Sequence, residues 1–188
     1  IRQSQTDPSG FNASAYGAAF VLGANGANLA SGTTGYAVVY GQTGTTDPLR
    51  LVRFSNGIGS DGVLTNVISA TPATFNDLGN QYLAIRVTYA PATNTWSMYG
   101  SVLSASTFST TNPLTASTLL GSASNSTYTS SNLRYIGCLW NHSTTVANAA
   151  LFDNIHIPQL CIPTVNLTST SASSSEAVGT ITVNLTIF

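Results

Sequence analysis

The chain has 188 residues, of which 43% are hydrophobic and 6% are charged, and its five basic and six acidic side chains leave a formal net charge of −1. All five basic residues are arginines scattered along the chain, so they cannot form the basic stripe that nucleic-acid binding requires. The same count excludes attraction to an anionic membrane surface. The hydrophobic fraction and low net charge exclude an intrinsically disordered chain. We therefore expect one ordinary domain with a sizeable core, plus a short remnant.

Serine, threonine and asparagine replace charged residues on the expected surface, in runs such as STFSTTN and SASNSTYTSS. These side chains favour strands and turns over helices. The chain contains no lysine and a single glutamate, Glu176, so good solvent-facing helix formers are scarce. No apolar run approaches the roughly 20 residues of a membrane helix, so we expect neither a membrane anchor nor membrane insertion. This composition indicates a secreted or cell-surface all-β protein.

Short runs in which apolar and polar residues alternate indicate strands separated by turns rich in Gly, Asn and Asp-Pro. The expected strands are, in chain order, residues 17–23, 35–41, 48–54, 62–69, 82–89, 95–103, 133–140 and 150–158. Because no segment has a helical apolar period, we predict an all-β fold, an antiparallel two-sheet β-sandwich.

The clearest hairpin joins YLAIRVTY to TWSMYGSVL through the turn APATNT. Placing Tyr89 opposite Trp96 brings the apolar residues of both strands onto one face, in register along their length. Trp96 is then expected in the core. The polar face carries Arg86 opposite Tyr99, and this face is expected to meet solvent or a groove.

The composition changes at PQLCIP, where two prolines end the preceding strand. We therefore divide the chain into a sandwich domain at residues 1–160 and a C-terminal segment at residues 161–188. Within that segment, apolar residues alternate strictly with polar ones over residues 180–187, which predicts a half-buried extended strand.

The two cysteines, Cys138 and Cys161, form an even pair that favours a disulfide in an extracytoplasmic protein. If residues 133–140 and 150–157 pair as a hairpin, however, Cys138 lies near Asp153 and well short of Cys161. Two alternatives therefore remain open for the cysteines: a disulfide between them, or two buried free thiols.

The segments GYAVVYG, PLRLVRFSNGI, YLAIRVTYAPATNTWSMY, LRYIGCLWNHS and FDNIHIP resemble a laminin-G-like member of the concanavalin A-like lectin/glucanase superfamily. The version that they resemble occurs in large secreted proteins of Bacteroidetes-type bacteria, and the similarity covers residues 10–158. Residues 163–188 resemble the first two strands of a Calx-beta module. Glu176 stands at that family's glutamate position, but Ala177 replaces its usual glycine, so no calcium site is carried over.

The resemblance implies a jelly-roll sandwich of the concanavalin A type. It also implies either a glycan-cleaving enzyme or a glycan-binding module. Retaining glycosidases of this superfamily need two carboxylates about 5 Å apart, usually presented on an E-x-D-x-x-E strand. The expected sandwich contains no glutamate, and its aspartates are widely separated in the sequence: Asp7, Asp47, Asp61, Asp77 and Asp153. We therefore predict a noncatalytic carbohydrate- or surface-binding module, with a glycoside hydrolase as the less favoured reading.

Two groups of residues are candidates for ligand binding. Arg86 and Tyr99 could form a sugar platform, in which the ring stacks on a pyranose and the guanidinium binds hydroxyls; the alternative is a surface cation–π pair without a ligand. Trp140, Asn141 and His142 lie where an expected strand gives way to a loop, and could recognise a sugar. Asn and His are also ordinary turn residues, so a structural role is the alternative.

Asp153 and Asn154 are candidates for calcium binding, against the alternative of a hydrogen-bonded edge residue. No cofactor is expected apart from possible Ca²⁺. The expected partner is a polysaccharide or cell-surface glycan. A second hypothesis is a structural adhesin or filament segment, in which residues 180–187 complete the sheet of another copy by strand addition.

Overall fold

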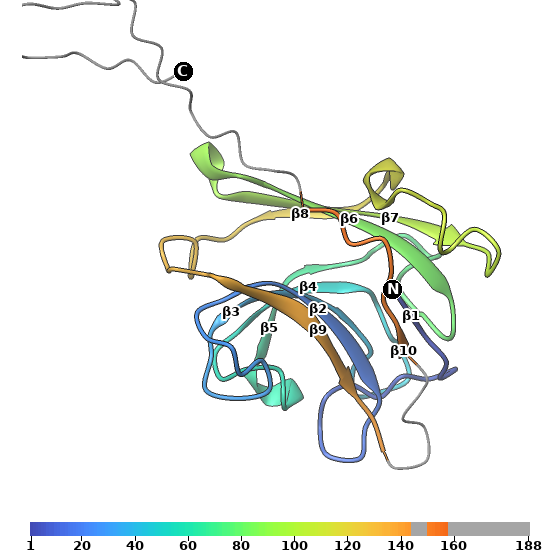
Figure 1. Cartoon of the computed structure of the whole chain (residues 1–188), viewed down its shortest axis with the longest axis horizontal. Helices are drawn as coiled ribbons and strands as arrows, with labels where there is room; N and C mark the ends of the chain where they lie inside the picture. The colour runs from blue at the N-terminus through green and yellow to red at the C-terminus, as the bar shows by residue number, and fades with distance from the viewer. Residues whose placement is uncertain (144–149, 158–188) are drawn as a thin grey trace, which may run out of the picture. The chain divides into compact units, whose positions relative to one another are not determined.

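The computed structural model describes residues 1–143 and 150–157, which form two five-stranded antiparallel sheets packed face to face (Figure 1). Sheet A has the order β10-β1-β6-β7-β8, and sheet B has the order β5-β4-β3-β2-β9. The strands are β1 (Arg2–Gln3), β2 (Gly17–Ala24), β3 (Gly35–Tyr40), β4 (Arg50–Phe54), β5 (Leu64–Ser69), β6 (Tyr82–Ala90), β7 (Thr95–Leu103), β8 (Thr118–Ser124), β9 (Tyr135–Asn141) and β10 (Ala150–Leu151). The predicted all-β, two-sheet antiparallel sandwich is confirmed. No helix in the described ranges has the length and apolar character to cross a membrane.

The predicted hairpin is confirmed as β6 and β7, which pair without interruption from Tyr82↔Leu103 to Ala90↔Thr95. Its turn is a short 3₁₀ segment that ends at Asn94, whose φ of 51° is in the left-handed region. The Tyr89 hydroxyl donates to Asn94 Oδ1 at 2.7 Å. Because the side-chain period of a strand is two, this register places one complete set of side chains in the core and the other outside.

Strands β8, β1 and β10 differ from the sequence expectation. The sequence of β8, TLLGSAS, is rich in small and hydroxyl residues and was not predicted to be a strand. It pairs with β7 along six positions, so its neighbour in the sheet stabilises an extended conformation that its own composition only weakly favours. Strand β1 was also not predicted, and β10 covers two residues where a strand over 150–158 was expected.

The hairpin considered as one possibility for residues 133–140 and 150–157 does not form. Strand β9 pairs with β2 in sheet B, whereas β10 pairs with β1 in sheet A. Strand β2 is largely buried and pairs with β3 along one edge. Strand β9 forms the hydrogen bonds that the backbone of β2 needs along its other edge. Cys138 faces Phe20 across this ladder. Cys161 lies outside the described residues, and a bridge between the two cysteines remains a prediction.

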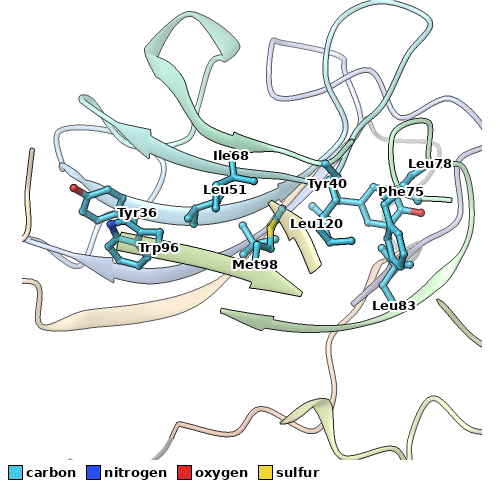
Figure 2. Close-up of a cluster of buried hydrophobic side chains, with 14 residues drawn as sticks. Tyr36, Tyr40, Leu51, Ile68, Phe75, Leu78, Leu83, Trp96, Met98 and Leu120 are labelled. Atoms are coloured by element: carbon cyan, nitrogen blue, oxygen red, sulfur yellow. The ribbon is translucent and has the colours of Figure 1, made fainter. Parts of the chain in front are cut away.

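The main core lies between the sheets and contains an aromatic stack at one end (Figure 2). Trp96, predicted as a core residue, is 8% exposed and lies 4.5 Å from Tyr36 and 4.6 Å from Tyr89 between ring centroids. Its Nε1 donates to the Asn125 carbonyl at 3.0 Å, and the Tyr36 hydroxyl donates to Asn125 Oδ1 at 2.7 Å. The buried polar atoms of the stack are therefore hydrogen-bonded.

A second apolar cluster covers the opposite face of sheet B. It joins alternate residues of the strands to loop residues, including Val21, Val39, Phe54, Phe11 and Ile58. Sheet B is therefore apolar on both faces, because the loops before β2 and after β4 fold over its outer side. The outer face of sheet A, by contrast, carries hydroxyl, aromatic and guanidinium groups, and it is the face on which recognition residues can gather.

Candidate functional site

Arg86 and Tyr99, the first predicted pair, meet on the outer face of sheet A. They are paired across β6 and β7, and the Arg86 guanidinium lies 3.8 Å from the centroid of the Tyr99 ring. Arg86 Nε also donates to the Ala116 carbonyl at 3.2 Å. This bond ties the guanidinium to the 3₁₀ turn at Pro113–Thr115 and fixes it over the ring. The surface cation–π pair is therefore present.

The surroundings of this pair are neutral and mostly hydroxylic. Ser97 and Ser122, from β7 and β8, share a hydrogen bond of 2.8 Å on the same face. Leu119, opposite Tyr99 on β8, is 51% exposed. We define Arg86, Tyr99, Ser97, Ser122 and Leu119 as the platform. It combines a stacked aromatic and cation with hydroxyl groups and an apolar contact.

The loop between β7 and β8 crosses the same sheet and was not expected to contribute. Phe108 packs on Tyr82 with ring centroids 5.2 Å apart, and the Arg2 guanidinium lies 5.2 Å from the Tyr82 ring. A hollow of about 320 Å³ lies between residues 110–113 of this loop and residues 154–156. Its lining is mostly threonine, asparagine and histidine. The sequence carried no signal for it, because the two lining segments are about forty residues apart.

Asp153 and Asn154, the candidates for calcium, lie beside this hollow in a hydrogen-bonded loop. The Asn154 N–H donates to Asp153 Oδ1 at 2.8 Å, and Asn154 Nδ2 donates to the carbonyls of Phe108 at 3.3 Å and Thr111 at 3.1 Å. Asn154 has a φ of 51°, which asparagine tolerates better than most residues. Within the described ranges, no group of three His, Cys, Asp or Glu side chains is arranged to hold a metal ion. Calcium binding remains a prediction.

Trp140, Asn141 and His142, the second predicted group, lie at the end of β9 in sheet B. Trp140 packs against the main core, and the exposed His142 ring stacks on it at 6.1 Å with an interplanar angle of 23°. The amide of Asn141 is committed to the fold, because Nδ2 contacts the carbonyls of Gly10, Asn12 and Ala15 at 3.0–3.1 Å. The structure thus brings these three residues together, but on a different sheet from the platform.

Replacing Asn141 by aspartate is expected to lower the free energy of unfolding by about 2–3 kcal/mol, because a carboxylate cannot donate to carbonyls and would face them with like partial charge. Urea denaturation measures the change. His142→Ala, at the exposed neighbouring position, is the control and should change stability by about 0.5 kcal/mol or less. Equal effects of the two substitutions would contradict the structural role of Asn141.

Three of the aspartates that are widely separated in the sequence lie close together in the structure. Asp47 is 1% exposed, its carboxyl accepts a hydrogen bond from the Gln42 N–H at 3.0 Å, and its backbone N–H donates to Asp77 Oδ1 at 3.2 Å. Burial, followed by the proximity of Asp7 and Asp77, raises the pKa of Asp47 to about 7, against a hydrogen bond from the Gln42 N–H that lowers it. Asp7 and Asp77 are exposed. Separation in the sequence does not reveal this cluster, because three loops converge at one end of the sandwich from positions 30–40 residues apart.

The fold and the platform place this chain in the class of all-β antiparallel sandwich proteins with a polar outer sheet face. Comparison with known proteins gives no finer assignment: no family model, no curated protein and no solved structure matches the chain.

Proposed function

We propose that the protein is a noncatalytic carbohydrate- or surface-binding module of a secreted or cell-surface protein, of the laminin-G-like, concanavalin A-like type that its strand sequences resemble. The observation that carries the proposal is the Arg86–Tyr99 stack, fixed in a neutral, hydroxyl-rich face. In the described part of the chain, the guanidinium makes one hydrogen bond, through Nε. The N–H groups of its terminal nitrogens are therefore available to sugar hydroxyls.

The chemistry of the platform suits a neutral polyol. An aromatic ring offers the C–H face of a pyranose an apolar contact, while hydroxyl and guanidinium groups replace the hydrogen bonds that the sugar makes with water. The hollow beside residues 110–113 adds further hydroxyl and amide groups on the rim of the same sheet. Both features come from rigid strands or from a loop that is packed on them, which reduces the entropic cost of binding.

A glycosidase is less well supported than a binding module. Asp7 and Asp77 lie close enough to Asp47 to raise its pKa, but a nucleophile or acid must reach the scissile bond, and Asp47 is almost completely buried. This carboxyl cluster is therefore positioned to hold loops together. No carboxylate belongs to the platform.

The proposal predicts that Tyr99→Ala weakens binding to a soluble polysaccharide by about two- to tenfold, the effect of losing one aromatic contact. Arg86→Ala is expected to act similarly. A glycan array identifies the polysaccharide, and isothermal titration calorimetry, with and without Ca²⁺, measures the affinity. Arg53→Ala, which removes the same charge from β4 in the other sheet, is the matched control and should leave the affinity unchanged. Absence of binding to every glycan tested would overturn the proposal.

A structural role by strand addition is the second candidate function. The observation that favours it is a backbone edge on β6, beyond the short strand β1, with which no strand of the described residues pairs.

A further inference from the structure

The two flanks of the sandwich are closed to different degrees. On one flank, β8 of sheet A contacts the segment that follows β5 of sheet B, because the Thr71 N–H donates to the Leu120 carbonyl at 3.4 Å. A Cβ atom on Gly121 would lie 2.5 Å from Ile68 Cγ2, so the sheets approach closely there. On the other flank, sheet B ends in β9, and sheet A continues beyond β6 only as β1 and β10, which have two residues each (Figure 1).

Within the described part of the chain, the outer edge of β6 has a pairing partner only near its start. Strand β1 pairs with β6 at Tyr82, and the Leu83 N–H donates to the Ile1 carbonyl at 2.9 Å. Because alternate residues of an antiparallel strand direct their N–H and C=O groups to the same edge, Ile85, Val87 and Tyr89 direct theirs to this edge as well. No strand in residues 1–143 or 150–157 pairs with them there.

The side chains that line this flank are apolar and incompletely covered. Ile85 and Val87 point toward the main core but are only half-buried. On β9, Ile136 and Cys138 alternate with the outward Leu139 and so face the same inter-sheet side, and Ile136 is 49% exposed. An unpaired edge beside uncovered apolar side chains is the arrangement that accepts an additional strand.

Residues 180–187 have the pattern that such an acceptor requires. Their apolar side chains occupy alternate positions and would cover the inter-sheet side, while threonine and asparagine would face solvent. The segment has eight residues, against the seven of β6 from Ala84 to Ala90. It carries no charge, and the whole chain has a net charge of −1, so electrostatic repulsion between two copies is weak.

We infer that the outer edge of β6 accepts residues 180–187 of a second copy of this chain as an added antiparallel strand. This inference rests on the second candidate function and is independent of glycan binding. The contact is head-to-tail, because each copy offers one donor segment and one acceptor edge. Such contacts give rings or open chains of copies.

The test compares Val183→Asp with Thr182→Asp in the full chain. Both add one charge to the donor segment, one on the apolar face and one on the polar face, and neither lies in the sandwich. Light scattering after size exclusion, over a range of protein concentrations, should show assemblies for the unmodified chain and for Thr182→Asp. Val183→Asp should give monomers. Amide exchange at Ile85, Val87 and Tyr89 should be slow in the assemblies and about tenfold faster or more in Val183→Asp.

The outcomes separate the parts of the inference. A monomeric unmodified chain overturns it, whether the β6 amides are protected or not. Assemblies that survive Val183→Asp, or that are lost equally with Thr182→Asp, show another interface and also overturn it. Assemblies that Val183→Asp dissolves without any change at the β6 amides leave strand donation intact but refute β6 as the acceptor. Glycan affinity, measured on the same variants, reports on the first proposed function separately.

Discussion

Replacing Trp96 by alanine is expected to lower the free energy of unfolding by about 3–5 kcal/mol, the cost of removing a large buried aromatic side chain. Trp96 lies between Tyr36 and Tyr89, and its Nε1 is hydrogen-bonded to the Asn125 carbonyl. The substitution therefore loses two ring contacts and leaves a cavity in the aromatic stack. Urea or guanidinium denaturation, followed by circular dichroism, measures the change.

Tyr99→Ala is the matched control for Trp96→Ala. Tyr99 lies three residues further along β7 but points to the outer face, where its main partner is the Arg86 guanidinium. Its loss is expected to cost about 1 kcal/mol or less. A stability loss for Tyr99→Ala as large as that for Trp96→Ala would mean that the two faces of the hairpin are not core and surface as the register requires.

Replacing Asp47 by asparagine is expected to flatten the pH dependence of stability between about pH 4 and pH 7. The pKa of Asp47 is raised from 3.8 to about 7, chiefly by burial. In that pH range the folded protein holds a proton that the unfolded chain has released, so the free energy of unfolding falls as pH rises, by at most about 1.4 kcal/mol per pH unit. The stability associated with the proton on Asp47 is fully present below pH 3.8 and is lost as pH rises through 7.

The expected pH effect depends on the groups that face Asp47. Asp7 and Asp77 raise its pKa, and Asp47 in turn contributes to the raised pKa of Tyr40. Asparagine can still accept the hydrogen bond from the Gln42 N–H but has no charge to desolvate. The variant should therefore match the unmodified protein at pH 4 and exceed it in stability at pH 8. Asp153→Asn removes an exposed carboxylate elsewhere and should retain the slope; identical profiles for all three proteins would contradict the arrangement at Asp47.

The acid cluster and the platform are separate parts of the molecule. Asp7, Asp47 and Asp77 join three loops at one end of the sandwich, whereas Arg86 and Tyr99 lie on strands of sheet A. Changing the charge of the cluster is therefore expected to alter stability without removing any side chain of the platform. Measuring stability and glycan affinity on the same Asp47→Asn preparation keeps the two effects apart.

Local sequence was sufficient to predict most strands and one complete hairpin register. The alternation in YLAIRVTY and TWSMYGSVL places every side chain on a face, because a shift of one residue would exchange core for solvent. For the same reason the opposition of Arg86 and Tyr99 follows from the alternation of the two strands alone. The positions of Trp96 and Tyr99 on opposite faces follow from that single register.

Long-range pairing could not be predicted in this way. Strand β8 is extended because β7 provides its hydrogen-bond partners, and β9 joins β2 because a buried strand needs partners on both edges. The composition of β8 or β9 alone does not reveal these pairing partners. For the same reason, the sequence could not show whether residues 133–140 and 150–157 pair with each other, and in the structure they do not.

The alternation of apolar and polar residues alone determined that this chain forms two layers of strands around an apolar interior, because strand periodicity and burial are local properties. The packing of the two sheets decided which loops meet. It therefore also decided the raised pKa of Asp47, the hollow beside Asn154 and the hydrogen bonds of the Asn141 amide. Loop convergence depends on the order of strands across the sandwich, and that order is set by contacts between residues far apart in the sequence.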